Sequence, residues 1–192
     1  MNFSRIINGM IRAIRLDKAF YNEVEQDTSY NRDALAVVVI AALATGLGGL
    51  VRELLQVRIL AAVLGFIVAA VLIIAVFFIW VFIAHFVGTK FFKGQGDRGE
   101  VQRALGFAFA PQILNLLAFI PCLGGLIGLA AWVLTIVTGF IAVRESLDQD
   151  NTNAALTIIV SGVIGFIIQA AILAVFAALG LGAAAITGAF NQ

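Results

Sequence analysis

The single histidine of the chain, His85, is the first side chain that could carry chemistry. It lies in an apolar stretch, and an ionisable group in a membrane helix is a functional candidate by default. A neutral imidazole can ligate the metal of a haem or a chlorophyll. No second histidine is present to share such a group. We therefore expect a structural or interfacial role, no resident cofactor and no metal, and keep as the alternative an accessory subunit that uses His85 in a cofactor-containing membrane complex.

Two acidic clusters could bind a hard cation through carboxylate oxygens. The first precedes the apolar part of the chain and the second lies between its last two apolar stretches. They comprise Glu23, Glu25 and Asp27, and Glu145, Asp148 and Asp150. Neither has the spacing of a calcium-binding loop. We expect solvated carboxylates with ordinary ion pairs to nearby basic residues.

Two amides, Asn115 and Gln169, fall inside apolar stretches. Such groups hydrogen-bond across membrane helices, and we expect this of both. The alternative is a channel or carrier for a small or apolar solute, lined by these amides with Thr135 and Thr138. No charged residue is expected at mid-membrane depth, which argues against a proton-coupled transporter.

Signatures of catalysis are missing from the sequence. It contains no nucleophile elbow, no zinc-protease motif and no phosphate-binding loop. The one cysteine, Cys122, excludes an intrachain disulfide. The net charge of +1 does not suggest nucleic acid as a partner. We expect a protein that is not an enzyme.

The composition is that of a membrane protein. Of 192 residues, 62% are hydrophobic and 12% charged, against roughly 45–50% and 25% in soluble domains. Pro121 to Gly125 divides a 40-residue uncharged window into two. We predict an all-α polytopic fold, with a cytoplasmic segment over residues 1–33 and one membrane domain over 34–192. Its five predicted spans are 34–51, 59–86, 104–120, 123–143 and 154–179.

The N-terminal segment has the pattern of an amphipathic helix. Apolar side chains recur at helical spacing at Phe3, Ile6, Ile7, Met10 and Ile14. We expect this helix to lie in the membrane interface, with lipid headgroups bound by Arg5, Arg12 and Arg15. The alternative is a helix packed on the protein's own loops.

The distribution of basic residues predicts the orientation. With five spans, ten Lys and Arg residues share the side of the N-terminus, and only Arg52 and Arg58 lie on the other. The positive-inside rule then places the N-terminus in the cytoplasm and the C-terminus outside.

Small residues four positions apart predict close helix packing. We expect this within the bundle or between copies or other membrane proteins. The residues are Gly46, Gly49, Gly124, Gly128, Ser161 and Gly165.

Five segments together resemble the Yip family, five-span membrane proteins named for interaction with Ypt/Rab GTPases. The match looks closest to its prokaryotic members. The segments are 12–17 (RAIRLD), 21–25 (YNEVE), 91–96 (FFKGQG), 105–111 (LGFAFAP) and 142–147 (AVRESL).

The resemblance implies a five-span fold in a prokaryotic cell membrane and a non-enzymatic role. Eukaryotic relatives act in early secretory traffic, Rab binding and membrane shaping, and carry an Asp-Leu-Tyr-Gly-Pro motif. This sequence lacks that motif, so GTPase binding is not expected. We predict a scaffold or accessory protein that associates with itself or with other membrane proteins, organises or shapes the membrane, and has lipids among its partners.

Overall fold

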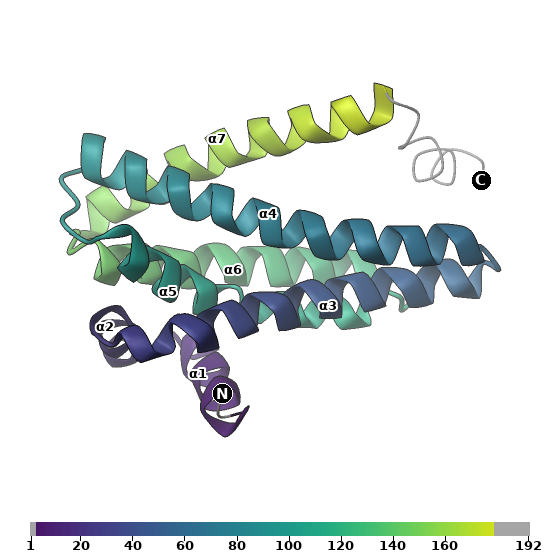
Figure 1. Ribbon diagram of the computed structural model, residues 1–192, viewed down its shortest axis with the longest axis horizontal. Helices are drawn as coiled ribbons and strands as arrows, with labels where there is room; N and C mark the ends of the chain where they lie inside the picture. Colours follow the sequence, from purple (N-terminus) through teal and green to yellow (C-terminus); the bar gives the residue numbers. More distant parts are fainter. Residues whose placement is uncertain (1–2, 179–192) are drawn as a thin grey trace.

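The computed structural model describes residues 3–178, and within them the chain is all-α. Long helices run side by side as a bundle, with short helices packed near one end (Figure 1). The elements are α1 (Phe3–Ile14), α2 (Lys18–Gln26), the 3₁₀ helix η1 (Thr28–Tyr30), α3 (Asn31–Leu55), α4 (Ile59–Phe91), α5 (Arg98–Ala108), the 3₁₀ helix η2 (Ala110–Leu117), α6 (Gly124–Ser146) and α7 (Asn151–Ala178).

Four helical segments among the described residues are long and apolar enough to cross a membrane. They are Thr28–Leu55, Ile59–Phe91, Gly124–Ser146 and Asn151–Ile172. They coincide with the first, second, fourth and fifth predicted spans, each starting or ending within a few residues of the prediction. The helices can be this apolar because lipid, rather than water, is the solvent for their outer faces. The chain is therefore a polytopic membrane protein.

The third predicted span, 104–120, is not one continuous helix. The α-helix α5 ends at Ala108, and η2 follows it. Pro111 explains the break, because it lacks an N–H and its ring clashes with the carbonyl four residues earlier. The side chain of Thr138 on α6 donates a hydrogen bond to the freed carbonyl of Ala108 at 2.8 Å.

An aromatic core joins the short helices to the bundle. Phe107 of α5 meets Phe20 of α2 edge to face, with ring centroids 4.9 Å apart, and Tyr30 at 5.9 Å. The rings of Phe20 and Phe107 are almost fully buried. We call the part built from α1, α2, η1 and α5 the cap.

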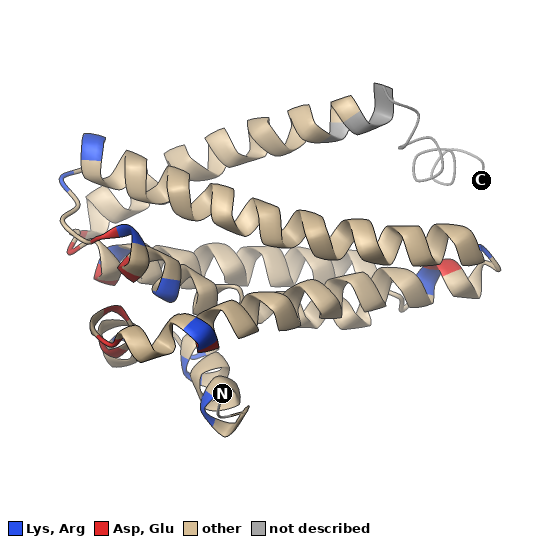
Figure 2. Ribbon diagram, in the orientation of Figure 1, with Lys and Arg blue, Asp and Glu red and all other residues tan. Residues whose placement is uncertain are grey.

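Charged residues gather at the two ends of the bundle (Figure 2). Most lie on the cap and at the adjoining ends of α4 and α6, and a small group lies at the α3–α4 turn. That small group contains Arg52, Glu53 and Arg58. The uncharged middle of the long helices is the part that suits a hydrocarbon environment.

Candidate functional site

The helix α1 lies across the direction of the long helices and packs against the rest of the cap (Figure 1). Its residues Ile6 and Ala13 are fully buried, and Met10 is almost so. Gly9 lies so close to the Phe107 ring that a Cβ atom would be 2.5 Å from it. One apolar face of α1 is therefore used for packing inside the protein.

A second apolar stripe on α1 is exposed. Phe3 is 68% exposed, and Ile7, Ile11 and Ile14 are 38–43% exposed. The buried face corresponds to the alternative of packing on the protein itself, and the location of the exposed face in the membrane interface stays a prediction. Ile6 and Met10, which we expected at the interface, pack against the protein, whereas Phe3, Ile7 and Ile14 stay on the surface.

Two of the three arginines expected at lipid headgroups have carboxylate partners. Arg5 forms an ion pair with Asp33 at 2.9 Å, and its guanidinium lies 3.8 Å from the centre of the Tyr30 ring. Arg12 binds Asp17 and Glu23, each at 2.8 Å. The guanidinium of Arg12 lowers the pKa of Asp17, and Asp17 in turn raises the pKa of Arg12.

Arg15 differs from the other two. It is exposed, and no ion pair joins it to another described residue. The expectation that these three arginines bind headgroups stays a prediction. Arg15 is the one of the three whose guanidinium forms no ion pair with another described residue.

Arg103 holds the cap together, and sequence analysis missed it. This α5 residue is 5% exposed. Its Nε donates to the carbonyl of Val24 at 2.9 Å, Nη1 donates to Oδ1 of Asn31 at 3.3 Å, and Nη2 donates to the carbonyl of Glu25. A cation at these carbonyls satisfies the unpaired acceptors at the end of α2.

The two acidic clusters come close in space through Glu25. Burial raises the pKa of Glu25 to about 7, with further contributions from the charges of Asp148, Glu100 and Glu145. Hydrogen bonding by Tyr30, followed by Arg12, lowers the pKa of Glu23 instead. No group of three or more potential metal ligands occurs within residues 3–178.

A chain of side-chain hydrogen bonds crosses the membrane part of the bundle. Asn115 donates to Oε1 of Gln112 at 2.6 Å and, at 3.4 Å, to Thr45 on α3. Gln112 donates to Thr135 on α6 at 2.9 Å. Gln112 was missed, although it lies three residues before Asn115, a spacing that brings side chains together on a helix.

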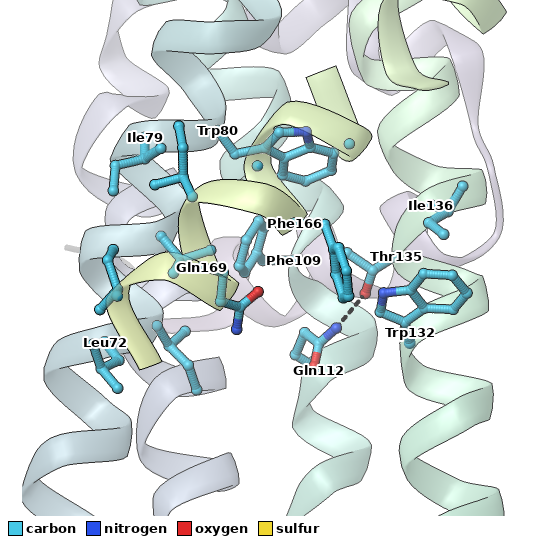
Figure 3. A pocket seen from close by; sticks show the side chains of 16 residues that line it. Leu72, Ile79, Trp80, Phe109, Gln112, Trp132, Thr135, Ile136, Phe166 and Gln169 are labelled. Atoms are coloured by element: carbon cyan, nitrogen blue, oxygen red, sulfur yellow. Dashed lines mark hydrogen bonds between the residues drawn. The ribbon is translucent and has the colours of Figure 1, made fainter. Parts of the chain in front are cut away.

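Gln169 lies beside a cavity of about 370 Å³ between α4, η2, α6 and α7 (Figure 3). The side chains of Gln112 and Thr135 also line it. Hydrophobic and aromatic side chains form most of its wall. We call this cavity the intramembrane pocket.

His85 lies away from that pocket, near the end of α4. It is half-buried, and its carbonyl accepts a hydrogen bond from Thr89 at 2.8 Å. Nothing in the described part of the chain surrounds its imidazole with metal ligands.

The predicted packing residues fall into two groups. Gly46 is in close contact, since a Cβ atom there would lie 2.9 Å from the Phe66 ring. Gly124 lies against the main chain of Ala118, Gly128 is in ordinary contact with Asn115, and Ser161 is fully buried. A Cβ atom at Gly49 or at Gly165 would meet no neighbouring atom within 4 Å, so these two glycines do not pack within the described bundle.

Comparison with protein families matches residues 17–173 to the Yip1 domain. No curated protein and no solved structure has significant similarity to the chain. The match spans α2 to α7 and so includes most of the cap together with the membrane helices.

Proposed function

The chain belongs to the Yip1 domain family. From that premise, and from the exposed stripe of α1, which precedes the matched residues, we propose that it organises membranes through this stripe. The family is non-catalytic and tied to membrane trafficking. The proposed role is that of a scaffold that is anchored by its long helices and acts on the leaflet next to the cap.

The observation that carries the proposal is the two-faced packing of α1. Buried Ile6 and Ala13 fix the helix to the bundle, while exposed Phe3, Ile7 and Ile11 form an unpartnered apolar stripe. Because α1 runs across the membrane helices, its length is parallel to the plane of a bilayer that these helices cross. An amphipathic helix in this position inserts its apolar face into the headgroup and acyl boundary.

The fixed position of α1 distinguishes it from a loose N-terminal anchor. Arg5 is paired to Asp33 in the first turn of α3, and Arg12 is paired to Asp17 and Glu23 at α2, which fixes the rotation of α1 about its own axis. A wedge held in this way adds area to one leaflet only, and that favours curvature.

Reconstitution into vesicles tests this role. The double variant Ile7→Glu/Ile11→Glu places charge on the stripe and leaves the buried face intact. The control is Asn8→Glu, which adds a carboxylate at an exposed polar position of the same helix. We expect vesicles with the wild type and the control to become smaller or tubular as the protein-to-lipid ratio rises, and those with the double variant to keep their shape. Unchanged shape with all three proteins contradicts the proposal.

We further propose association with copies of itself or with other membrane proteins. The most apolar windows of α4 and α7 are only 17% buried, against 44% in that of α3. A Cβ atom at Gly65 on α4 or at Gly162 on α7 would meet no atom of another element within 4 Å, so a neighbouring helix could approach these positions closely. Mass measurement after gentle detergent extraction separates the outcomes. A larger particle identifies its partners by composition, and a monomer contradicts this part of the proposal.

The break between α5 and η2 is compatible with a fifth crossing. The five α-helical residues 104–108 of the predicted span rise about 8 Å and the eight 3₁₀ residues of η2 about 16 Å, so this part alone covers most of the roughly 30 Å of a hydrocarbon core. Irregular backbone is tolerated at membrane depth when protein surrounds it, and η2 packs against α3 and α6. We propose five crossings, with α1, α2, η1 and the start of α5 in the cytoplasm of a prokaryotic cell and residue 178 near the opposite face.

A further inference from the structure

We propose that the intramembrane pocket binds a membrane-soluble molecule with a flat ring that carries a carbonyl group. This goes beyond the proposed role of α1, because the pocket is built from different elements. Its volume of about 370 Å³ falls in the range of small-molecule sites.

The pocket is placed at the middle of the membrane domain. Thr135, which lines it, is the middle residue of α6 (Gly124–Ser146). Unpaired polar groups are costly at this depth, because no bulk water is present to bind them.

Its polar groups present hydrogen-bond donors. The carbonyl oxygen of Gln112 accepts from Asn115, and one N–H of Gln112 donates to Thr135. The second N–H of Gln112 remains. The Gln169 amide lines the pocket, and no hydrogen bond joins it to another residue of the described chain. Two amides from η2 and α7 therefore face one cavity with N–H donors (Figure 3), and these match a ligand acceptor such as a carbonyl. The carbonyl oxygen of Gln169 can in addition accept from a ligand hydroxyl.

Its apolar wall favours a flat molecule. The rings of Trp80, Phe109, Trp132 and Phe166 all line the cavity. Aromatic side chains pack well against planar ring systems, in stacked or edge-to-face geometry. An acyl chain could fill the same space, but it would leave the second N–H of Gln112 and the Gln169 amide without a hydrogen-bond partner at a depth where no bulk water replaces one.

Access to the pocket is from the lipid side. Trp132 is 60% exposed and Phe166 72% exposed, so the wall formed by α6 and α7 is open to the surface. In Figure 1, α7 diverges from α4 toward its C-terminal end. A molecule dissolved in the bilayer can enter there without crossing water.

Tryptophan fluorescence gives a direct test, because both tryptophans of the chain line this pocket. The full chain in lipid nanodiscs is titrated with a benzoquinone that carries a decyl side chain. A brominated phospholipid serves as the second probe. We expect saturable quenching by the quinone, and an apparent Kd at least tenfold higher for Gln169→Leu and for Gln112→Leu. Gln56→Leu is the control, since Gln56 is exposed at the α3–α4 turn and does not line the pocket.

A filled pocket gives a second test that does not depend on the amides. Gly165 lines the cavity, and a Cβ atom there would meet no atom within 4 Å, so Gly165→Leu is chosen to occupy the space. Its control is Gly125→Leu, equally unobstructed on α6 and outside the pocket. We expect Gly165→Leu to abolish saturable quenching and Gly125→Leu to keep it. Non-saturable quenching in the wild type overturns the proposal. The proposal is also overturned if the brominated lipid quenches as strongly as the quinone and Gln169→Leu does not change that quenching, because the pocket then holds acyl chains.

Discussion

Arg103 donates a hydrogen bond from its Nε to the carbonyl of Val24 at 2.9 Å, across 79 positions of the sequence. The contact joins α5, which leads into η2, to α2, which follows α1 in the cap. The cap is therefore held by a buried guanidinium as well as by its aromatic core.

Replacing Arg103 is expected to loosen the cap. Arg103→Ala leaves the carbonyls of Val24 and Glu25 buried without their donor, which costs about 2–3 kcal/mol. We expect a lower free energy of unfolding in detergent micelles and faster proteolysis around residues 18–30. Arg103→Lys is expected to restore only part of the loss, because an ammonium cannot match the forked geometry.

The matched control is Arg98→Ala on the same helix. Arg98 is exposed, and its guanidinium lies 5.6 Å from the centre of the Phe82 ring. We expect Arg98→Ala to change the stability by well under 1 kcal/mol, as for exposed cation–π contacts. Equal protease resistance of Arg103→Ala and the wild type would show that the aromatic core alone holds the cap.

Sequence patterns were sufficient for the long helices and insufficient for the contacts of Arg103. Uncharged windows about 20 residues long predict spans because the bilayer sets their length, and four such segments are present among the described residues. The acceptors of Arg103 are mostly main-chain carbonyls, which every residue type carries. No spacing in the sequence marks such a partner. Pro111 was a visible signal for the break after Ala108, but the span prediction rested on the uncharged window and did not use it.

The glycines give a second, independent prediction. Gly46→Ala places a Cβ atom 2.9 Å from the Phe66 ring, between α3 and α4. Overpacking of this kind costs about 1–3 kcal/mol. In Gly49→Ala, on the same helix, the added Cβ atom meets no atom within 4 Å. We therefore expect this variant to be as stable as the wild type or slightly more stable. Thermal unfolding of both variants in one detergent checks the difference, and equal destabilisation would contradict the packing of Gly46.

This pair also shows what small-residue spacing can indicate. Small residues four positions apart predict a helix face without bulky side chains, and Gly46 and Gly49 both belong to such a pattern. Whether a neighbour occupies that face depends on how the helices are placed, which no local pattern encodes. Gly106 and Gly139 were not selected, yet Cβ atoms there would lie 2.8 Å from Ala34 and from Trp80.

The native cysteine provides a test of the five-crossing topology. Cys122 is exposed in the turn between η2 and α6. If the predicted third span, residues 104–120, crosses the bilayer, this turn lies on the side opposite to α1, α2 and η1. We expect a membrane-impermeant maleimide to label Cys122 in intact cells. Asn22→Cys in a Cys122→Ala background marks the cap, and we expect its labelling only after permeabilisation.

The two labelling patterns separate the alternative topologies. Labelling of both positions from the same side would mean that residues 98–123 enter and leave the membrane on one face. The bundle would then have four crossings, and the C-terminal end of α7 would lie on the same side of the membrane as the cap. Labelling of Asn22→Cys alone in intact cells would contradict the orientation expected from the basic residues.

Glu25 is expected to make the stability of the cap depend on pH. Its pKa is raised from 4.5 to about 7, first by burial and then by Asp148, Glu100 and Glu145. The folded protein therefore binds more protons than the unfolded chain between these values. Its free energy of unfolding falls as the pH rises from about 4.5 to 7. Glu25→Gln removes this penalty, and we expect it to stabilise the protein at pH 8 by about 1 kcal/mol, a figure reduced for partial exposure to water.

Glu23 on the same helix provides a control of opposite sign. Tyr30 and Arg12 lower its pKa, so the charged form is favoured in the fold, and its contribution is lost only as the pH falls below about 4.5. We expect Glu23→Gln to destabilise the protein at both pH 5 and pH 8. Glu25→Gln should give little benefit at pH 5 and a clear one at pH 8. Thermal unfolding of the three proteins at the two pH values measures this, and a pH-independent effect of Glu25→Gln would show that its carboxyl group is solvated rather than confined beside the other acids.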